Sequence, residues 1–306
     1  MNGNKTMKFA FFIGCNIPAR LQQYELSSRA VLDRLGVDLI DIREFNCCGY
    51  PMRNIDFNTY ILFSARNLAL AERRELDMIT LCKCCFGSLK KANHILKENK
   101  SLRDEVNRIL AKEGLAYSCG SEVIHMLSVL HQDIGTKSIK EKLNLLFKDL
   151  KIATHYGCHA LRPSEITQFD DPVAPVIFDE LVKVTGAKSV DWPLKLECCG
   201  APAMGINDSL SMTLTEKKQT DAKEAGANYL CSACPWCQLQ FDNAQKTAGI
   251  QRDNGQQIPS ILYTQLLGLG MGIEDKLLGF DMNAIDMSDI KKSLVPASSS
   301  KKKASG

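Results

Sequence analysis

The chain has 306 residues, a net charge of +3, 45% hydrophobic residues and 13 cysteines. This length allows two domains of roughly 150 residues each, and the hydrophobic content excludes wholesale disorder. No apolar run approaches the ~20 residues of a membrane span. The apolar stretch at 9–15 lacks the small-residue cleavage site that follows the apolar region of an export signal. We therefore predict a soluble, cytoplasmic chain without a membrane span.

The positive charge is concentrated at the C-terminus. Without Lys291, Lys292, Lys301, Lys302 and Lys303 the net charge is −2. A body this close to neutral has no basic face, which argues against a nucleic-acid partner. Because serines precede a run of lysines, we expect residues 291–306 to form a disordered basic tail.

The cysteines form a repeat. Each half of the chain contains a single cysteine, then a Cys-Cys-Gly triplet, then a C-x-x-C motif. Equivalent positions are 143 to 152 residues apart. In the first half the repeat comprises Cys15, Cys47, Cys48, Cys82 and Cys85, and in the second half Cys158, Cys198, Cys199, Cys234 and Cys237.

The segments between these cysteines also repeat. Strand-like runs end in a Gly-Cys turn at residues 8–15 and 151–158, and each is followed by a helical stretch and a short strand. Helical segments at 60–74 and 210–225 then precede short strands that lead to the C-x-x-C motifs. Alternating strands and helices imply parallel sheets, whose carboxyl edges collect the cysteines. We predict an α/β fold of two similar, duplicated domains, at 1–145 and 146–290, each with a small parallel sheet and a cysteine cluster at one edge.

Two segments lie outside the repeat. Amphipathic helices are predicted over 121–130 and 138–150, in the region where the domains meet. The apolar segment 258–273 is too short and too rich in glycine to span a membrane, so we assign it to the core or to a subunit interface.

Five thiols per half exceed the four that a tetrahedral zinc ion requires. Adjacent cysteines can reach different atoms of a cluster, and the following glycine lets the backbone approach it. Ligand sets made only of thiolates select iron–sulfur clusters, zinc or copper(I). We predict iron–sulfur clusters, with a structural zinc ion in each domain as the alternative.

These motifs resemble the CCG domains of the heterodisulfide reductase B subunit. The resemblance runs from about residue 8 to 273, and the segments around the motifs are more similar to this family than to glycolate or lactate oxidoreductase subunits. Similar segments are HYGCHALRPSE at 155–165, SARNLALAE at 64–72, ANHIL at 92–96 and LYTQLLGL at 262–269.

The resemblance implies a catalytic oxidoreductase subunit with two noncubane [4Fe-4S] clusters, each held by the five cysteines of one half. In the family the clusters flank a cleft in which the mixed disulfide of coenzyme M and coenzyme B is reduced to two thiols. Partner subunits are also implied, a flavin-containing A-like subunit and a C-like subunit with cubane [4Fe-4S] clusters. The chain itself has neither a flavin fingerprint nor a cubane C-x2-C-x2-C-x3-C-P motif.

Three cysteines lie outside the repeat. Cys84 and Cys231 could replace a ligand of the neighbouring C-x-x-C motif, although the spacing favours Cys85 and Cys237. We predict that Cys119 is a small buried residue.

His155 and His159 lie on either side of Cys158 and are the candidate catalytic residues. They could donate protons to released thiolates or hydrogen bonds to cluster sulfurs, and a packing role is the alternative. Arg53, Lys83 and Arg162 lie beside the motifs and could bind an anionic substrate or be surface charges. Two other functions remain open: an electron-transfer subunit without a disulfide substrate, and a zinc-stapled interaction module.

Overall fold

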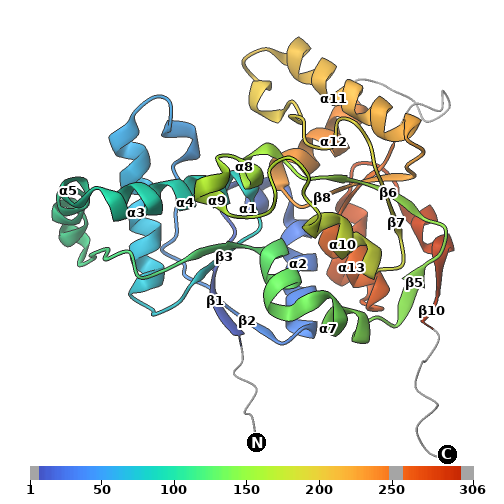
Figure 1. Ribbon diagram of the computed structural model, residues 1–306, viewed down its shortest axis with the longest axis horizontal. Coiled ribbons are helices and arrows are strands. Elements are labelled where there is room, and N and C mark those ends of the chain that lie inside the picture. The colour runs from blue at the N-terminus through green and yellow to red at the C-terminus, as the bar shows by residue number, and fades with distance from the viewer. Residues whose placement is uncertain (1–6, 248–257, 298–306) are drawn as a thin grey trace, which may run out of the picture.

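The computed structural model describes residues 7–247 and 258–297. Each half builds a four-stranded parallel sheet, and the two sheets have the same order, β2-β1-β3-β4 and β7-β6-β8-β9. The predicted duplicated α/β fold is confirmed (Figure 1). The strands are β1 (Met7–Phe12), β2 (Val37–Ile40), β3 (Met78–Thr80) and β4 (Val123–His125), then β6 (Lys151–His155), β7 (Lys188–Val190), β8 (Tyr229–Ser232) and β9 (Ser260–Leu262).

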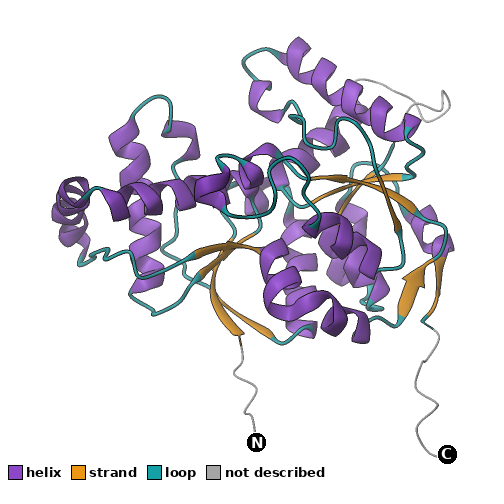
Figure 2. Ribbon diagram, viewed as in Figure 1, coloured by secondary structure: helices purple, strands orange, loops and turns teal. Residues whose placement is uncertain are grey.

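Helices connect the successive strands of both halves, and Figure 2 shows them packed around the two groups of strands. The first half has α1 (Asn16–Arg20), α2 (Gln22–Arg34), α3 (Phe57–Glu72), α4 (Lys83–Glu98), α5 (Lys100–Leu110), α6 (Met126–Ser128) and α7 (Thr136–Glu141). The second has α8 (Cys158–Leu161), α9 (Ser164–Thr167), α10 (Ile177–Val184), α11 (Asp208–Glu224), α12 (Pro235–Thr247), α13 (Tyr263–Gly270) and α14 (Asp275–Leu278). Short polar side chains cap the N-termini of two equivalent helices, α3 and α11. Asp56 accepts a hydrogen bond from the backbone amide of Thr59, and Asn207 accepts one from the backbone amide of Leu210.

The predictions for the segments outside the repeat are wrong in part. Residues 121–130 are not one helix, because Val123 and Ile124 pair with Met78 and Ile79 as the fourth strand of the first sheet. The predicted helix over 138–150 ends at Glu141. The apolar segment 258–273 is buried core, and it contains β9 as well as α13.

The two halves exchange helices. After β4, α6 and α7 cross over and pack against α10 of the second half, and after β9, α13 and α14 cross back and pack against α2 of the first half. Figure 1 shows α2, α7, α10 and α13 grouped together near both sheets. A buried hydrogen bond of 2.7 Å between Ser27 and Thr264 joins α2 to α13. This exchange fixes the orientation of one half relative to the other.

The first residues of the predicted C-terminal tail are ordered. Residues 291–297 are not a disordered tail, since Ser288–Ser293 form a 3-10 helix and β10 (Leu294–Pro296) follows it. β10 pairs antiparallel with β5 (Leu145–Phe147), at the predicted boundary between the domains. Backbone pairing and the buried side chain of Ile290 hold this segment on the body. Residues 298–306 lie outside the described residues.

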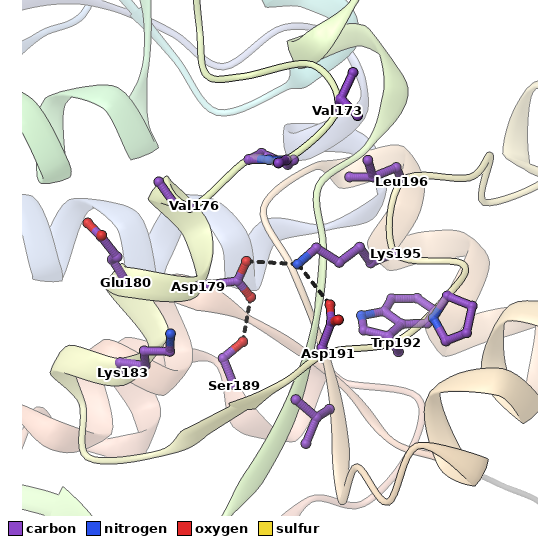
Figure 3. Close-up of a pocket in the computed structure, with 14 residues that line it drawn as sticks. Val173, Val176, Asp179, Glu180, Lys183, Ser189, Asp191, Trp192, Lys195 and Leu196 are labelled. Carbon is purple, nitrogen blue, oxygen red and sulfur yellow. Dashed lines mark hydrogen bonds and ion pairs between the residues drawn. The ribbon is translucent and has the colours of Figure 1, made fainter.

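A buried carboxylate ties α10 to the second sheet. Asp179 accepts hydrogen bonds from Thr154 at 2.7 Å, Tyr156 at 2.9 Å and Ser189 at 2.5 Å, and it pairs with Lys195 at 3.2 Å. Figure 3 shows Asp179, Ser189 and Lys195 in a cavity of about 700 Å³. Because Asp179, Ser189 and Lys195 already bond to protein groups, they have little remaining capacity to bind a ligand in this cavity.

Asp179→Ala is expected to lower the free energy of unfolding by about 3 kcal/mol, because it leaves several buried donors without an acceptor. Urea unfolding under anaerobic conditions measures the effect. Asp191→Ala is the matched control, since Asp191 binds the same Lys195 but its side chain is 95% exposed. Equal stability of the two variants would contradict the prediction.

Candidate iron–sulfur centre

The carboxyl ends of parallel strands carry the cysteines of both halves. Cys15 follows β1 after a Gly14 turn, and Cys82 follows β3 after one residue. In the second half Cys158 follows β6 and Cys234 follows β8. Because strands in one sheet point the same way, these turns lie at one edge of each sheet.

The five predicted cysteines of the first half lie together. They line one cavity, with Cys84 and Tyr50 beside them. Their side chains form a chain of neighbouring thiols in which each sulfur interacts with the next. We call them the first-half cysteines, in the order of this chain Cys15, Cys47, Cys48, Cys85 and Cys82.

The second half repeats this arrangement. Its five predicted cysteines form an equivalent chain of thiol contacts, and His155 joins Cys199 and Cys237 in a group whose potential ligand atoms lie within 4.8 Å of one another. The second-half cysteines, in the order of the chain, are Cys158, Cys198, Cys199, Cys237 and Cys234.

The two chains of thiols meet at Cys82, Cys84 and Cys234, whose sulfurs lie within 4.8 Å of one another. The meeting follows from how the halves pack, because α4 lies against α8 and α1 lies against α12. Cys84, which the sequence left as an alternative ligand, contacts Cys82 and Cys234, whereas Cys85 contacts Cys48 and Cys82. Cys85 therefore belongs with the first-half cysteines. Cys84 lies where the two sets meet, at Cys82, Cys84 and Cys234, which we call the junction.

The other two cysteines are elsewhere. Cys231 lies inside β8, fully buried in the hydrophobic core. Cys119 lies in a loop, where Arg103 donates to its sulfur at 3.8 Å, and it is half-buried rather than buried as predicted.

The Cys-Cys-Gly turns have the same geometry in both halves. Gly49 and Gly200 have φ values of +85° and +90°, in the left-handed region that favours glycine. Ser64 donates to the carbonyl of Cys48 at 2.7 Å, and Thr215 donates to the carbonyl of Cys199 at 3.0 Å. These hydroxyls sit at equivalent positions of α3 and α11, and comparing the halves of the repeat would have identified them.

The first cysteine of each Cys-Cys-Gly turn favours the thiolate form. Hydrogen bonds from Cys15 and Cys48 lower the pKa of Cys47 to about 2. In the same way Cys158 and Cys198 form a donor–acceptor pair, with the pKa of Cys198 lowered to about 2 and that of Cys158 raised. Thiolates are the species that bind metals. Each turn thus presents one sulfur ready for metal binding, with neighbouring thiols able to lose their protons to a cluster.

The two candidate histidines differ in exposure. His155 is 1% exposed, and its Nε2 lies 3.2 Å from the sulfur of Cys237. Because burial also lowers its pKa, we expect a neutral ring that donates from Nε2 to this sulfur. A proton-donating catalytic role for His155 stays a prediction. His159 is half-buried, with its Nδ1 3.2 Å from the sulfur of Cys84 and its Nε2 3.5 Å from the Tyr50 hydroxyl.

The basic residues beside the motifs do not share one site. Lys83 is 1% exposed, so an anion in solvent cannot reach it, and its role as an anion-binding residue does not fit. Arg162 is exposed. Arg53 is half-buried and lies 5.1 Å from the centre of the Tyr50 ring, near the junction.

Two segments of the chain, residues 9–90 and 152–242, match the family of the CCG cysteine-rich domain. Over 91% of this chain and 94% of the relative, the sequence is 37% identical to the B subunit of a ferredoxin:CoB-CoM heterodisulfide reductase of Methanosarcina mazei. The chain belongs to the family of heterodisulfide reductase B subunits. Membership marks it as part of an oxidoreductase, and its cysteine-rich domains indicate iron–sulfur clusters.

Other relatives show the range of this family. The B subunit of a ferredoxin/F(420)H(2)-dependent CoB-CoM heterodisulfide reductase from Methanosarcina acetivorans is 36% identical over 91% of this chain and 94% of the relative. A Wolinella succinogenes protein named 8-methylmenaquinol:fumarate reductase membrane anchor subunit is 34% identical over 92% and 99%. A crystal structure of a hypothetical Helicobacter pylori protein shares the fold, with a TM-score of 0.70 and 19% identity over 92% of this chain and 52% of that one.

The residues at the junction fit iron–sulfur clusters. Two sets of five thiols, each in contact with its neighbours in the set and mostly buried, match the ligand chemistry of iron–sulfur clusters and exceed what two zinc ions require. Among the described residues, no helix is long and apolar enough to cross a membrane.

Proposed function

We propose that the chain is the disulfide-reducing subunit of a heterodisulfide reductase and holds two noncubane [4Fe-4S] clusters, one on each set of five cysteines. The observation that carries the proposal is the meeting of the two sets at Cys82, Cys84 and Cys234. A substrate at this junction lies next to both sets. The names of the relatives support a mixed disulfide of the coenzyme M and coenzyme B type.

Reduction of a disulfide consumes two electrons and two protons and yields two thiols. When bound, the clusters supply one electron each and a Lewis-acidic iron. The protein's own residues position the disulfide and deliver protons. The chain supplies such residues at the junction.

We assign proton delivery to His159. Burial lowers the pKa of its ring, so at neutral pH the ring is neutral and acts as a relay, in which the N–H at Nδ1 passes to a released thiolate while Nε2 takes up another proton. The Tyr50 hydroxyl lies 3.5 Å from its Nε2. Burial also raises the pKa of Tyr50, so its hydroxyl does not ionise by itself, and it passes a proton to Nε2 of His159 only as it regains one from solvent.

We propose that electrons reach this protein from partner subunits. A C-like subunit with cubane clusters passes single electrons, and an A-like flavin subunit feeds that pathway. The relatives are named as subunits of such reductases, which supports a complex of this kind. A cytoplasmic location stays a prediction.

The disulfide substrate is tested with an artificial donor. Reduced methyl viologen, the anaerobically purified chain and the coenzyme M–coenzyme B disulfide are expected to yield two oxidised viologens and two free thiols per disulfide. Viologen absorbance and thiol titration measure both. Clusters that are present and reducible, with no disulfide-dependent oxidation, would contradict this substrate.

Electron transfer without a disulfide substrate is the second candidate function. The Wolinella relative favours it, because that protein is named as a subunit of a fumarate reductase and its name includes no disulfide. The two functions differ in their response to thiols. If the chain binds a disulfide, adding the product thiols changes the paramagnetic signal of the oxidised clusters. An unchanged signal favours electron transfer alone.

The cluster content is tested by elemental analysis. Protein purified without oxygen is expected to contain about eight irons and about eight acid-labile sulfides per chain. Iron, sulfide and zinc assays measure this directly. About two zinc ions with negligible iron would mean structural zinc sites and would overturn the reductase proposal.

A further inference from the structure

The two halves differ in the charges that they place around their cysteines. Directly after the first cysteine of each C-x-x-C motif stand Lys83 and its counterpart Pro235. The last residues of β1 and β6 are Phe12 and His155. In each pair one residue carries a charge or can donate a hydrogen bond, namely Lys83 and His155. Both side chains contact groups of the second half.

Lys83 starts α4 in the first half, but its side chain reaches into the second half. Its Nζ donates to the carbonyl of His155 at 3.3 Å and lies 5.1 Å from the centre of the Phe178 ring. Burial lowers the pKa of Lys83, but a carbonyl and a ring face both attract a cation, so these neighbours favour the ammonium form. The cysteines that act most on its charge all belong to the second half: Cys237, Cys234, Cys231 and Cys158.

A second buried lysine lies beside the same set. Lys218 of α11 is 1% exposed, donates to the carbonyl of Leu194 and lies 4.5 Å from the centre of the Trp192 ring. Burial lowers the pKa of Lys218 to about 8, and the nearby sulfurs of Cys199 and Cys237 oppose this shift. The equivalent residue of α3 is Asn67, which is neutral and donates to the carbonyl of Cys47 at 3.0 Å.

His155 adds a hydrogen bond to this asymmetry. Its Nε2 lies 3.2 Å from the sulfur of Cys237. A hydrogen bond to a ligand sulfur draws electron density from the cluster and raises its reduction potential. The equivalent residue Phe12, in the first half, has no hydrogen to donate.

We propose that the second-half cluster has the higher reduction potential and takes up the first electron, an inference that rests on the two clusters of the proposed function. Each cluster gains one electron from a one-electron donor, and each reduction adds one negative charge. Two buried ammonium groups stabilise that charge strongly, because water does not screen them. The exposure of Cys15 acts in the opposite direction, because water stabilises the added charge on the first-half cluster. The first-half cluster is then the stronger reductant.

Lys83→Met tests the proposal, because methionine retains the length of the side chain and removes its charge. Anaerobic redox titration with dithionite and mediators, followed by EPR, gives the midpoint potential of each cluster. At a fixed potential, the ratio of reduced to oxidised second-half cluster is expected to fall about tenfold, which is 59 mV for a one-electron couple. The first-half cluster is expected to shift much less.

Three comparisons make the result specific. Lys97→Met removes a lysine from the far end of the same helix and is expected to leave both potentials unchanged. Lys218→Met is an independent second variant and is expected to lower the same potential. Cys15→Ser and Cys158→Ser change equivalent ligands, so the EPR signal that each one alters belongs to that half.

Each outcome separates this inference from the function beneath it. A higher potential for the first-half cluster, no shift in both lysine variants, or an equal shift of both clusters overturns the inference while the clusters remain. Wild-type protein without iron overturns the cluster proposal instead, and elemental analysis of the same samples detects that case.

Discussion

Cys85→Ala is expected to reduce the iron content from about eight to about four per chain, whereas Cys84→Ala retains about eight. Both cysteines lie in the first turn of α4 and both are buried. Cys85 contacts Cys48 and Cys82 within the first-half chain, so its loss opens the ligand set of that half. Cys84 contacts Cys82, Cys234 and His159 at the junction and is not needed to complete either set.

Iron and sulfide assays on the two anaerobically purified variants measure this difference, and circular dichroism shows whether both have folded. The pair is closely matched, because the residues are adjacent and each change removes one buried thiol. Loss of iron in Cys84→Ala with retention in Cys85→Ala would exchange the two assignments. The remaining iron in Cys85→Ala is expected to give the EPR signal that Cys158→Ser alters.

Gly200→Ala is expected to destabilise the protein by about 3 kcal/mol and to remove the second-half cluster. The backbone here has a φ of +90°, and an added Cβ meets the carbonyl of Ser211 and lies 3.0 Å from the Thr215 hydroxyl. The turn must move, which breaks the hydrogen bonds from Ser211 to Gly200 and from Thr215 to Cys199. Cys198 and Cys199 then leave their places beside Cys158 and Cys237.

Thermal denaturation and iron content measure both effects. Gly205→Ala is the control, since Gly205 has a φ of +82° but open space where the Cβ would lie. It is expected to cost about 1 kcal/mol and to retain all of the iron. Equal iron content in the two variants would mean that steric contact at the Cys-Cys-Gly turn does not position the ligands.

Much of the fold follows from short-range patterns in the sequence. The strands that end in Gly-Cys turns and the helical stretches that follow them lie where the sequence predicts them. The fourth strand of each sheet was missed. Val123–His125 and Ser260–Leu262 are three residues long and run directly into helices, so their apolar side chains merge with helical periodicity.

The sequence by itself determined that each half gathers a set of five cysteines, because parallel strands place their carboxyl ends at one edge of a sheet, but it left Cys84 and Cys231 as alternatives. Only the tertiary structure decided what joins the sets. Lys83 and His155 are 72 residues apart in the sequence, and Cys84 and His159 are 75 apart, yet each pair is in contact. Such contacts depend on the packing of α4 against α8 and on the exchange of α7 and α13 between the halves. Packing between distant helices is set by the shape of whole surfaces, which no local spacing of residues encodes.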